Sequence, residues 1–438
     1  MATTYRTEPL KTYDKAKEIR SQHFRDVFTA KEQGKILTVG DLHGPKEIVA
    51  AFGEVVHIGG EPWAVFITRE GQETGLPLQA LEAAESHGYA RDLCGMTRMF
   101  WGAMFLDKSP WGMPFPRPDF SIGTNSCDYK GKWHQVTAEY LGIPRFVWEI
   151  GPHHSFGGTL KVSEQCIQYG VAQLEEFIAW LEKQLGRKCD DEKLVESLAN
   201  YYRSRCYWGE VCQLEAHVPV PLEYKLLLPF FLLMEYQPYK KETVDTLAEL
   251  KDEVKYRISR GITPLPEERA RVTHEGLPPW YALHLFRYLR RHGVAVVGGS
   301  NHFMFIAPVQ KRRDDFLFHP MDPVEWDGIP KTREQALRFR TLCEYYSEVR
   351  RINHGVAVMM MLEAARAWRV DGIIMEQDRG CINWCVGQIE LRNAIQKAGI
   401  PCMHYEANRV DHREWSWPHV SDALDAFMEA LGVPRVEE

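Results

Sequence analysis

DFSIGTNSCDYKGKWHQVTAEYLGIPRFVWEIG, residues 119–151, and DGIIMEQDRGCINWCVGQIELRNAIQKAGIPCMHYEAN, residues 371–408, share one pattern of predicted elements. Each stretch predicts a strand, a polar loop with a cysteine, a helix, Gly-Ile-Pro and a second strand. Cys127 and Cys381 therefore follow the carboxyl end of a strand, the edge where open α/β sheets bind ligands. A helix N-terminus beside each cysteine favours a thiolate. The repetition predicts a cofactor held between two related α/β units.

The rest of the chain divides into predicted segments. A charged N-terminal helical segment occupies residues 1–35, and a first α/β domain with alternating strands and helices occupies 36–155. Apolar residues at helical spacing predict a helical segment over 156–265, and a second α/β domain follows at 266–438. The predicted fold class is therefore α/β, with two flavodoxin- or Rossmann-like parallel sheets, a helical segment between them and an N-terminal helix.

Three local predictions concern stretches without a repeated pattern. The apolar residues 63–67 look strand-like, and the Pro-rich residues 263–280 read as a break between elements. Residues 332–368 are predicted as one long helix.

Composition and charge exclude several classes of protein. The 438 residues carry a formal net charge of −7, which does not suit a nucleic-acid-binding surface. The polar N-terminus lacks the apolar region of a secretion signal, and no apolar run reaches the roughly 18 residues of a membrane span. We expect a cytoplasmic protein that binds neither nucleic acid nor membrane and keeps its ten cysteines reduced.

The cysteine spacing leaves the role of the thiols open. Cys206 and Cys212 are six residues apart and diverge around a helix, and Cys381 and Cys385 have no second pair nearby to complete a zinc finger. Dispersed cysteines at loop ends could hold an iron–sulfur cluster, with Cys94 as a third ligand beside the two cysteines of the repeated pattern. Reduced thiols that pack in the core explain the same spacing.

Five stretches, taken in order, carry a resemblance to a known family. They are GPKEIVAAFG at 44–53, Cys94 with Arg98, CDYKGKWHQVTAEYLGIP at 127–144, MDP at 321–323, and the strand, cysteine loop, helix and Gly-Ile-Pro of 370–401. Together they resemble the 2-hydroxyacyl-CoA dehydratase and benzoyl-CoA reductase family. The resemblance covers roughly residues 36–430 and is weakest in the helical segment.

The resemblance implies a [4Fe-4S] cluster bound through three cysteines, which correspond here to Cys94, Cys127 and Cys381. Cys385 is a rival for the third position. In the family this ligand lies about 18 residues before a Gly-Ile-Pro. Cys381 lies 18 residues before Gly399 and Cys385 lies 14 before it, so Cys381 is preferred.

Within the family, the aromatic-rich chain, with FVWEIGPHHS and GCINWC, is most similar to the larger cluster-binding subunit of ATP-dependent benzoyl-CoA reductase. This similarity implies dearomatisation of benzoyl-CoA to a cyclohexadiene-carboxyl-CoA in anaerobic aromatic degradation, with ferredoxin as electron donor. The implied partners are a homologous cluster-binding subunit and ATP-hydrolysing activator subunits with a bridging cluster. The chain lacks the GxxxxGK[ST] phosphate-binding loop, which agrees with ATP hydrolysis by a partner.

Two alternatives lie within the same family. The chain could be a subunit of a 2-hydroxyacyl-CoA dehydratase, or a non-catalytic electron-relay or scaffold subunit. Outside the family, a clusterless α/β binding protein remains open.

Residues in loops near the expected cleft are candidates for catalytic proton transfer. His43, His153, His154 and His302 stand at strand exits or in Gly-rich loops. Glu47 corresponds to the glutamate of the family's first motif.

Overall fold

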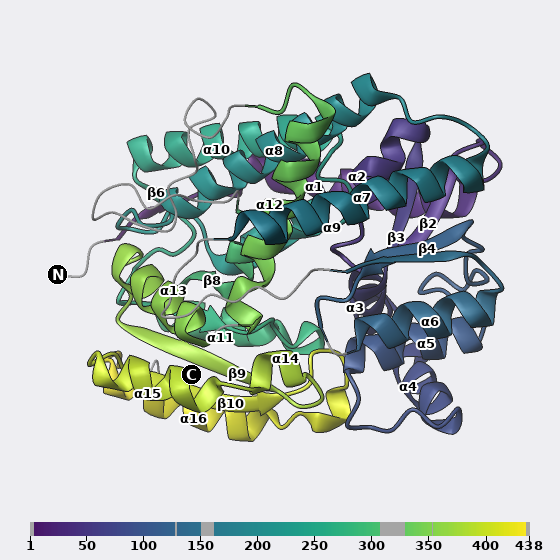
Figure 1. Ribbon diagram of the computed structural model, residues 1–438. Helices are drawn as coiled ribbons and strands as arrows, with labels where there is room; N and C mark the ends of the chain where they lie inside the picture. The colour runs from purple at the N-terminus through teal and green to yellow at the C-terminus, as the bar shows by residue number, and fades with distance from the viewer. Residues whose placement is uncertain (1–3, 128, 150–161, 307–328, 353, 435–438) are drawn as a thin grey trace.

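The computed structural model describes residues 4–127, 129–149, 162–306, 329–352 and 354–434. Two parallel four-stranded sheets lie in different parts of the molecule, the first at the right of Figure 1 and the second at the lower left. Long helices cross the upper part of the view above both sheets. The predicted α/β class with parallel sheets is confirmed, as is the N-terminal helix, α1 (Lys11–Thr29).

The first sheet contains β2 (Ile36–Gly40), β3 (Val55–Gly59), β4 (Phe120–Thr124) and β5 (Arg145–Trp148). Its strand order is β3-β2-β4-β5, and all neighbouring strands are parallel. Every residue of β2, β3 and β4 is buried. These apolar runs therefore form strands that are covered on both faces, as parallel sheets require.

The second sheet contains β7 (Ala270–Glu275), β8 (Val294–Gly299), β9 (Gly372–Asp378) and β10 (Cys402–Ala407). Its order is β10-β9-β7-β8, again with parallel neighbours. The prediction of a break at 263–280 was wrong, because β7 lies within it at the centre of the sheet. Prolines flank this strand but none lies inside it, and all six of its residues are buried.

Both sheets have the same strand order when their strands are numbered along the chain. In each sheet the first strand pairs with the second on one side and with the third on the other. The crevice between the first and third strands is thus the switch point where open α/β sheets bind ligands. Cys127 follows the third strand of the first sheet and Cys381 follows the third strand of the second. The repeated sequence pattern therefore corresponds to a repeated topology.

The helices around the first sheet are α2 (Lys46–Val49), α3 (Gly60–Glu70), α4 (Leu76–Ser86), α5 (Gly95–Phe105) and α6 (Lys130–Leu141). Helix α3 shows that the strand-like interpretation of residues 63–67 was wrong. A short apolar run does not distinguish a buried strand from a buried helix, and here the run lies on the buried side of a helix.

The predicted helical segment contains α7 (Glu164–Leu185), α8 (Asp191–Leu214), α9 (Tyr224–Tyr236) and α10 (Lys241–Arg260). A short parallel pair, β1 (Arg6–Thr7) with β6 (Ile262–Thr263), joins the N-terminal segment to the end of these helices. Short 3-10 helices also occur, at η1 (Ala50–Phe52), η2 (Trp280–Ala282), η3 (Ser300–Phe305) and η4 (His412–Glu414). The domain limits stated above remain a prediction.

The helices of the C-terminal part are α11 (His284–Arg291), α12 (Arg333–Ile352), α13 (His354–Ala367), α14 (Ile382–Cys385), α15 (Gln388–Lys397) and α16 (Trp417–Ala430). The single helix predicted over 332–368 is thus assigned as α12 and α13, on either side of residue 353, which lies outside the described residues.

One hydrophobic cluster connects the two sheets. It contains Val39 and Val56 of the first sheet together with Val272, Val296 and Ile374 of the second. A continuous core of this kind fixes the two sheets relative to each other, so that loops from both can line one pocket. No helix among the described residues is long and apolar enough to cross a membrane.

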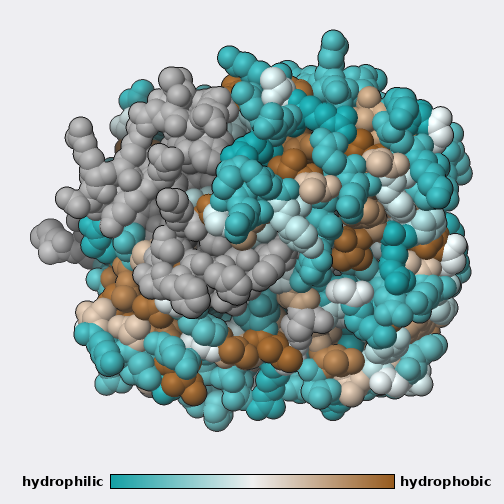
Figure 2. Space-filling view, in the orientation of Figure 1, coloured by the Kyte–Doolittle hydropathy of each residue, from teal (hydrophilic) through white to brown (hydrophobic). Residues whose placement is uncertain are grey.

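The surface seen in Figure 2 is largely hydrophilic, with apolar patches in its lower part. Helices α14, α15 and α16 lie in that part of Figure 1. Ile382, Val386 and Ile389, which follow Cys381 closely in the chain, are exposed apolar side chains of this region.

Candidate functional site

Each of the three predicted cysteine ligands stands at or just before the start of a helix. Cys94 is the N-cap of α5, and Cys381 is the N-cap of the one-turn helix α14. The carbonyl of Cys127 accepts a hydrogen bond of 3.2 Å from the amide of Lys130, the first residue of α6. The partial positive charge at the N-termini of α5 and α6 favours negative charge on the neighbouring sulfur.

These three cysteines line the same pocket. Cys94 and Cys381 are buried and Cys127 is half-buried. The pocket contains about 610 Å³ free of protein atoms, part of which is open to solvent. Much of its wall is apolar, with Val65, Met96, Phe231, Leu277, Trp280 and Met304 among the lining residues. Residues that are distant in the sequence therefore meet in one largely water-poor space.

Cys385, the rival of Cys381, does not belong to the residues that line this pocket. Its thiol donates a hydrogen bond of 2.9 Å to the carbonyl of Asp378. Partial burial raises the pKa of Cys385 to about 11. The geometry therefore supports the preference for Cys381.

Arg409 brings a positive charge to Cys381. Its Nη1 lies 3.7 Å from the Cys381 sulfur, and its Nε lies 2.9 Å from a carboxylate oxygen of Asp378. The guanidinium also lies over the ring of Trp384, 5.3 Å from the ring centre. Trp384, whose role the sequence could not assign, thus packs against the cation that faces the cysteine.

Burial opposes ionisation of two of the pocket thiols. It raises the pKa of Cys94, and it raises the pKa of Cys381 well above the usual range even though the charge of Arg409 acts in the opposite direction. Thiolates here require additional positive charge. Three cysteines in a largely apolar pocket fit the donor set of an iron–sulfur cluster better than that of Mg²⁺ or Ca²⁺, which prefer oxygen.

Carboxyl and phenol groups line another part of the pocket. Tyr129 donates a hydrogen bond of 3.0 Å from its hydroxyl to Glu61, whose other oxygen accepts one of 3.1 Å from the amide of Leu42. Burial raises the pKa of Glu235 well above its usual range, and the charge of Glu61 raises it further. Burial thus favours the uncharged, protonated form of the Glu235 carboxyl, which is the form that can donate a proton.

Asp41 connects the end of β4 to α6 by hydrogen bonds at the switch point of the first sheet. Its Oδ2 accepts hydrogen bonds from the amide of Thr124 at 2.8 Å and from His134 Nε2 at 2.9 Å, and Oδ1 lies 3.6 Å from Lys130 Nζ. Burial alone raises the pKa of Asp41, but Lys130 and His134 outweigh it and hold the pKa well below its usual range. A Cβ atom at Gly123 would lie 1.9 Å from His134 Nε2, so only glycine fits beside these hydrogen bonds.

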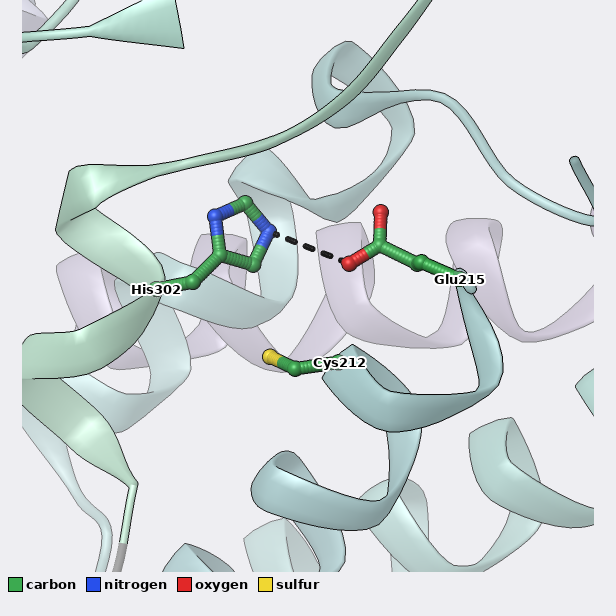
Figure 3. Close-up of side chains that lie close together, drawn as sticks. All are labelled: Cys212, Glu215 and His302. Atoms are coloured by element: carbon green, nitrogen blue, oxygen red, sulfur yellow. Dashed lines mark ion pairs between the residues drawn. The ribbon is translucent and has the colours of Figure 1, made fainter. Parts of the chain in front are cut away.

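The predicted catalytic residues do not lie in the pocket wall, as far as the described residues show. His43 and Glu47 belong to a separate buried cluster, in which His43 Nδ1 lies 2.8 Å from Glu344 and Glu47 pairs with Arg340. His302 lies in η3, 3.7 Å from Glu215 and close to Cys212 (Figure 3). Cys212, Glu215 and His302 together could hold a metal ion.

Two of the predicted features cannot be placed. His153 and His154 lie outside the described residues, as does the MDP motif at 321–323. Their proposed roles remain predictions.

Several pocket residues were missed by the sequence analysis. Tyr129 and Lys130 lie two and three residues after Cys127 in the quoted stretch, so their positions were available from the predicted strand end. Glu235 ends the apolar run of α9, and a carboxyl there was a detectable signal of a special role. Arg409 gave no such signal, because the contact with Cys381 spans 28 residues of chain.

The chain matches known proteins along nearly its whole length. A family model described as 2-hydroxyglutaryl-CoA dehydratase, D-component, matches residues 42–431. The (R)-phenyllactyl-CoA dehydratase alpha subunit of Clostridium sporogenes is 25% identical over 427 residues, covering 96% of each chain. The (R)-2-hydroxyisocaproyl-CoA dehydratase alpha subunit of Clostridioides difficile is 23% identical and covers 94% of each. The (R)-2-hydroxyglutaryl-CoA dehydratase subunit alpha of Acidaminococcus fermentans is 22% identical, covering 95% of this chain and 96% of the relative.

Proposed function

We propose, because the chain belongs to the 2-hydroxyglutaryl-CoA dehydratase, D-component family, that it is a subunit of a 2-hydroxyacyl-CoA dehydratase-type complex. The observation that carries the proposal is the convergence of Cys94, Cys127 and Cys381 on one pocket. The three relatives, all named as dehydratase alpha subunits, favour this function over the benzoyl-CoA reductase expected from the sequence. An alpha subunit also implies a second, partner subunit.

In this proposal Cys94, Cys127 and Cys381 hold a [4Fe-4S] cluster. Such a cluster, when bound, supplies an electron at low potential and an iron position that no cysteine occupies. Arg409 faces the Cys381 sulfur and so stabilises the thiolate there. The apolar wall keeps water from the sulfur atoms, which favours a low potential. The homologous subunit, ATP-hydrolysing activator subunits and ferredoxin remain the proposed partners.

The polar side of the pocket matches the proton transfers that dehydration requires. Conversion of a 2-hydroxyacyl-CoA to an enoyl-CoA breaks the C2–OH bond and a C3–H bond, and the two fragments leave as water. The departing hydroxyl needs a proton, and burial of Glu235 favours the neutral acid that can supply it. Glu61, fixed by Tyr129 and Leu42, is the carboxylate placed to take the proton from C3. We assign these roles to Glu235 and Glu61.

The substitution Glu235→Gln tests the acid role. Glutamine keeps the size of the side chain but cannot release a proton, so kcat should fall by about 10²–10⁴-fold with little change in KM. Glu223→Gln is the matched control, since Glu223 is also buried, stands at the N-cap position of the same helix α9 and has a pKa raised by burial to about 7. Glu223 lies outside the pocket wall, so the control should keep its rate. Full activity in Glu235→Gln would contradict the assignment and favour a relay or scaffold subunit.

A benzoyl-CoA reductase subunit is the second candidate. Phe231, Trp280 and Trp384 line the pocket, and aromatic walls suit a flat aromatic acyl group. The same walls suit an aromatic 2-hydroxyacyl group, so the pocket alone does not separate the two reactions.

The two candidates differ in their products. The chain is reconstituted without oxygen together with its homologous subunit, the activator and a reductant, and is offered (R)-phenyllactyl-CoA or benzoyl-CoA. We expect water loss from the hydroxyacyl thioester over many turnovers per electron supplied, measured by mass spectrometry, and no reaction with benzoyl-CoA. Reduction of benzoyl-CoA with no dehydration would contradict the proposal. Omission of either partner should abolish turnover.

A further inference from the structure

A buried group of three metal-ligating side chains lies apart from the cysteine pocket. Cys212 is in the last turn of α8, Glu215 follows that helix, and His302 is in η3 after β8. Figure 3 shows the three side chains directed toward one another. Their ligand atoms all lie within 4.8 Å of one another, and each residue is buried. The group therefore joins the helical segment to the second sheet.

The imidazole nitrogen and the carboxylate of this group are poorly satisfied among the described residues. His302 Nδ1 lies 3.1 Å from the carbonyl of Gly299, which can only accept, so Nδ1 carries the proton and Nε2 presents a lone pair. That Nε2 lacks a hydrogen-bond partner, and neither carboxylate oxygen of Glu215 has one of normal geometry. The amide of Gly298 lies close enough to lower the carboxyl pKa, but burial raises it well above its usual range.

A proton shared between Glu215 and His302 does not explain this arrangement. The Oε2–Nε2 distance is 3.7 Å, which is longer than a hydrogen bond. Buried oxygen and nitrogen atoms without a hydrogen-bond partner then face one another beside the Cys212 sulfur, which costs free energy unless a further group binds between them.

The backbone of all three residues is held in place by buried donors. Trp368 Nε1 donates to the carbonyl of Cys212 at 2.9 Å, and Trp208 Nε1 donates to that of His302 at 2.9 Å. Arg271 donates to the carbonyl of Glu215 at 2.7 Å. Such support for each ligand-bearing residue is typical of preorganised metal sites.

We propose that Cys212, Glu215 and His302 bind one zinc ion. A set of one thiolate, one imidazole and one carboxylate suits zinc, and the sulfur disfavours Mg²⁺ and Ca²⁺. On binding, the Cys212 thiol and the Glu215 carboxyl release to solvent any proton they hold, and the cation replaces it. Water completes the coordination. The site does not depend on the proposed function, and its role is to fix the end of α8 against the second sheet.

Metal analysis of the holoprotein tests this site. The protein is purified without oxygen in zinc-replete medium, and zinc and iron are measured separately by mass spectrometry. We expect about one zinc per wild-type chain. Cys212→Ala, Glu215→Gln and His302→Ala should each lose it, while the iron content stays unchanged.

Cys206→Ala is the matched control, because Cys206 is buried on the same helix but lies outside the group. It should retain the zinc. Titration of chelator-treated wild type with Co²⁺ avoids variants that fail to fold, and should give the visible absorption of a thiolate-bound cobalt. Wild type that neither contains zinc nor takes up cobalt would overturn the site. Zinc retained in all three variants, or iron lost in its place, would overturn it as well.

Discussion

Serine in place of Cys94, Cys127 or Cys381 is expected to remove the iron from the protein and to lower dehydratase activity by more than about 100-fold. Substitution of a residue that hydrogen-bonds to a metal ligand typically lowers metal affinity or activity by about 10–100-fold. Loss of a ligand itself should have a larger effect. All three side chains line one pocket, and among the described residues no other cysteine lines it to take the place of a lost ligand. Iron content, visible absorption and turnover of the reconstituted complex measure the effect.

Cys385→Ser is the matched control for this series. Cys385 is four residues from Cys381, but its thiol donates to the carbonyl of Asp378 and does not line the pocket. The variant should keep its iron and at least half of the wild-type activity. Iron loss in Cys385→Ser together with iron retention in Cys381→Ser would show that Cys385, and not Cys381, is the third ligand.

The substitution Arg340→Met is expected to lower the free energy of unfolding by about 3–5 kcal/mol. Arg340 is buried, pairs with Glu47 and with Glu344 at 2.9 Å, and donates to the carbonyl of His43 at 2.6 Å. Burial alone raises the pKa of Glu344, but His43 and Arg340 outweigh it and lower the pKa to about 2. Methionine removes the cation and leaves two buried carboxylates without it. Urea denaturation measures the change.

Arg338→Met is the control for this prediction, since Arg338 lies on the same helix α12 but pairs with Glu164 at the surface. An exposed pair contributes at most about 1 kcal/mol, so this variant should stay close to wild type. Adding Glu47→Gln to Arg340→Met should recover part of the loss, because one uncompensated charge is removed. Equal stability of the Arg340 and Arg338 variants would contradict the structural role of the cluster.

The sequence was sufficient for the parts of the fold that depend on local pattern. The strand, cysteine loop and helix around Cys127 and Cys381 are encoded by nearby residues, and both copies fold as expected. Strand β7 was missed because its six residues look irregular between prolines. They form a strand through pairing with β8 on one side and β9 on the other. The shared strand order of the two sheets followed from β7 and could not be predicted without it.

In the candidate site, too, only the features that depend on nearby residues could be predicted from the sequence. Cys94 was a candidate from its place at a loop end and from the family resemblance, whereas its position beside Cys127 and Cys381 depends on contacts across the whole chain. Glu47 was proposed as catalytic from its correspondence to the family's motif glutamate, and its partner in the structure, Arg340, lies 293 positions away. His302 likewise faces Glu215 and Cys212, which precede it by 87 and 90 residues. Sequence spacing and motifs do not reveal contacts between side chains that are so far apart in the chain.

The most direct test of the cysteine pocket is the iron and acid-labile sulfide content of the wild-type chain, purified without oxygen and apart from its partners. A [4Fe-4S] cluster on Cys94, Cys127 and Cys381 predicts about four iron and four sulfide per chain and a brown protein. Colourless protein without iron or sulfide, which also fails to take them up on reconstitution, would contradict the cluster and the dehydratase function built on it.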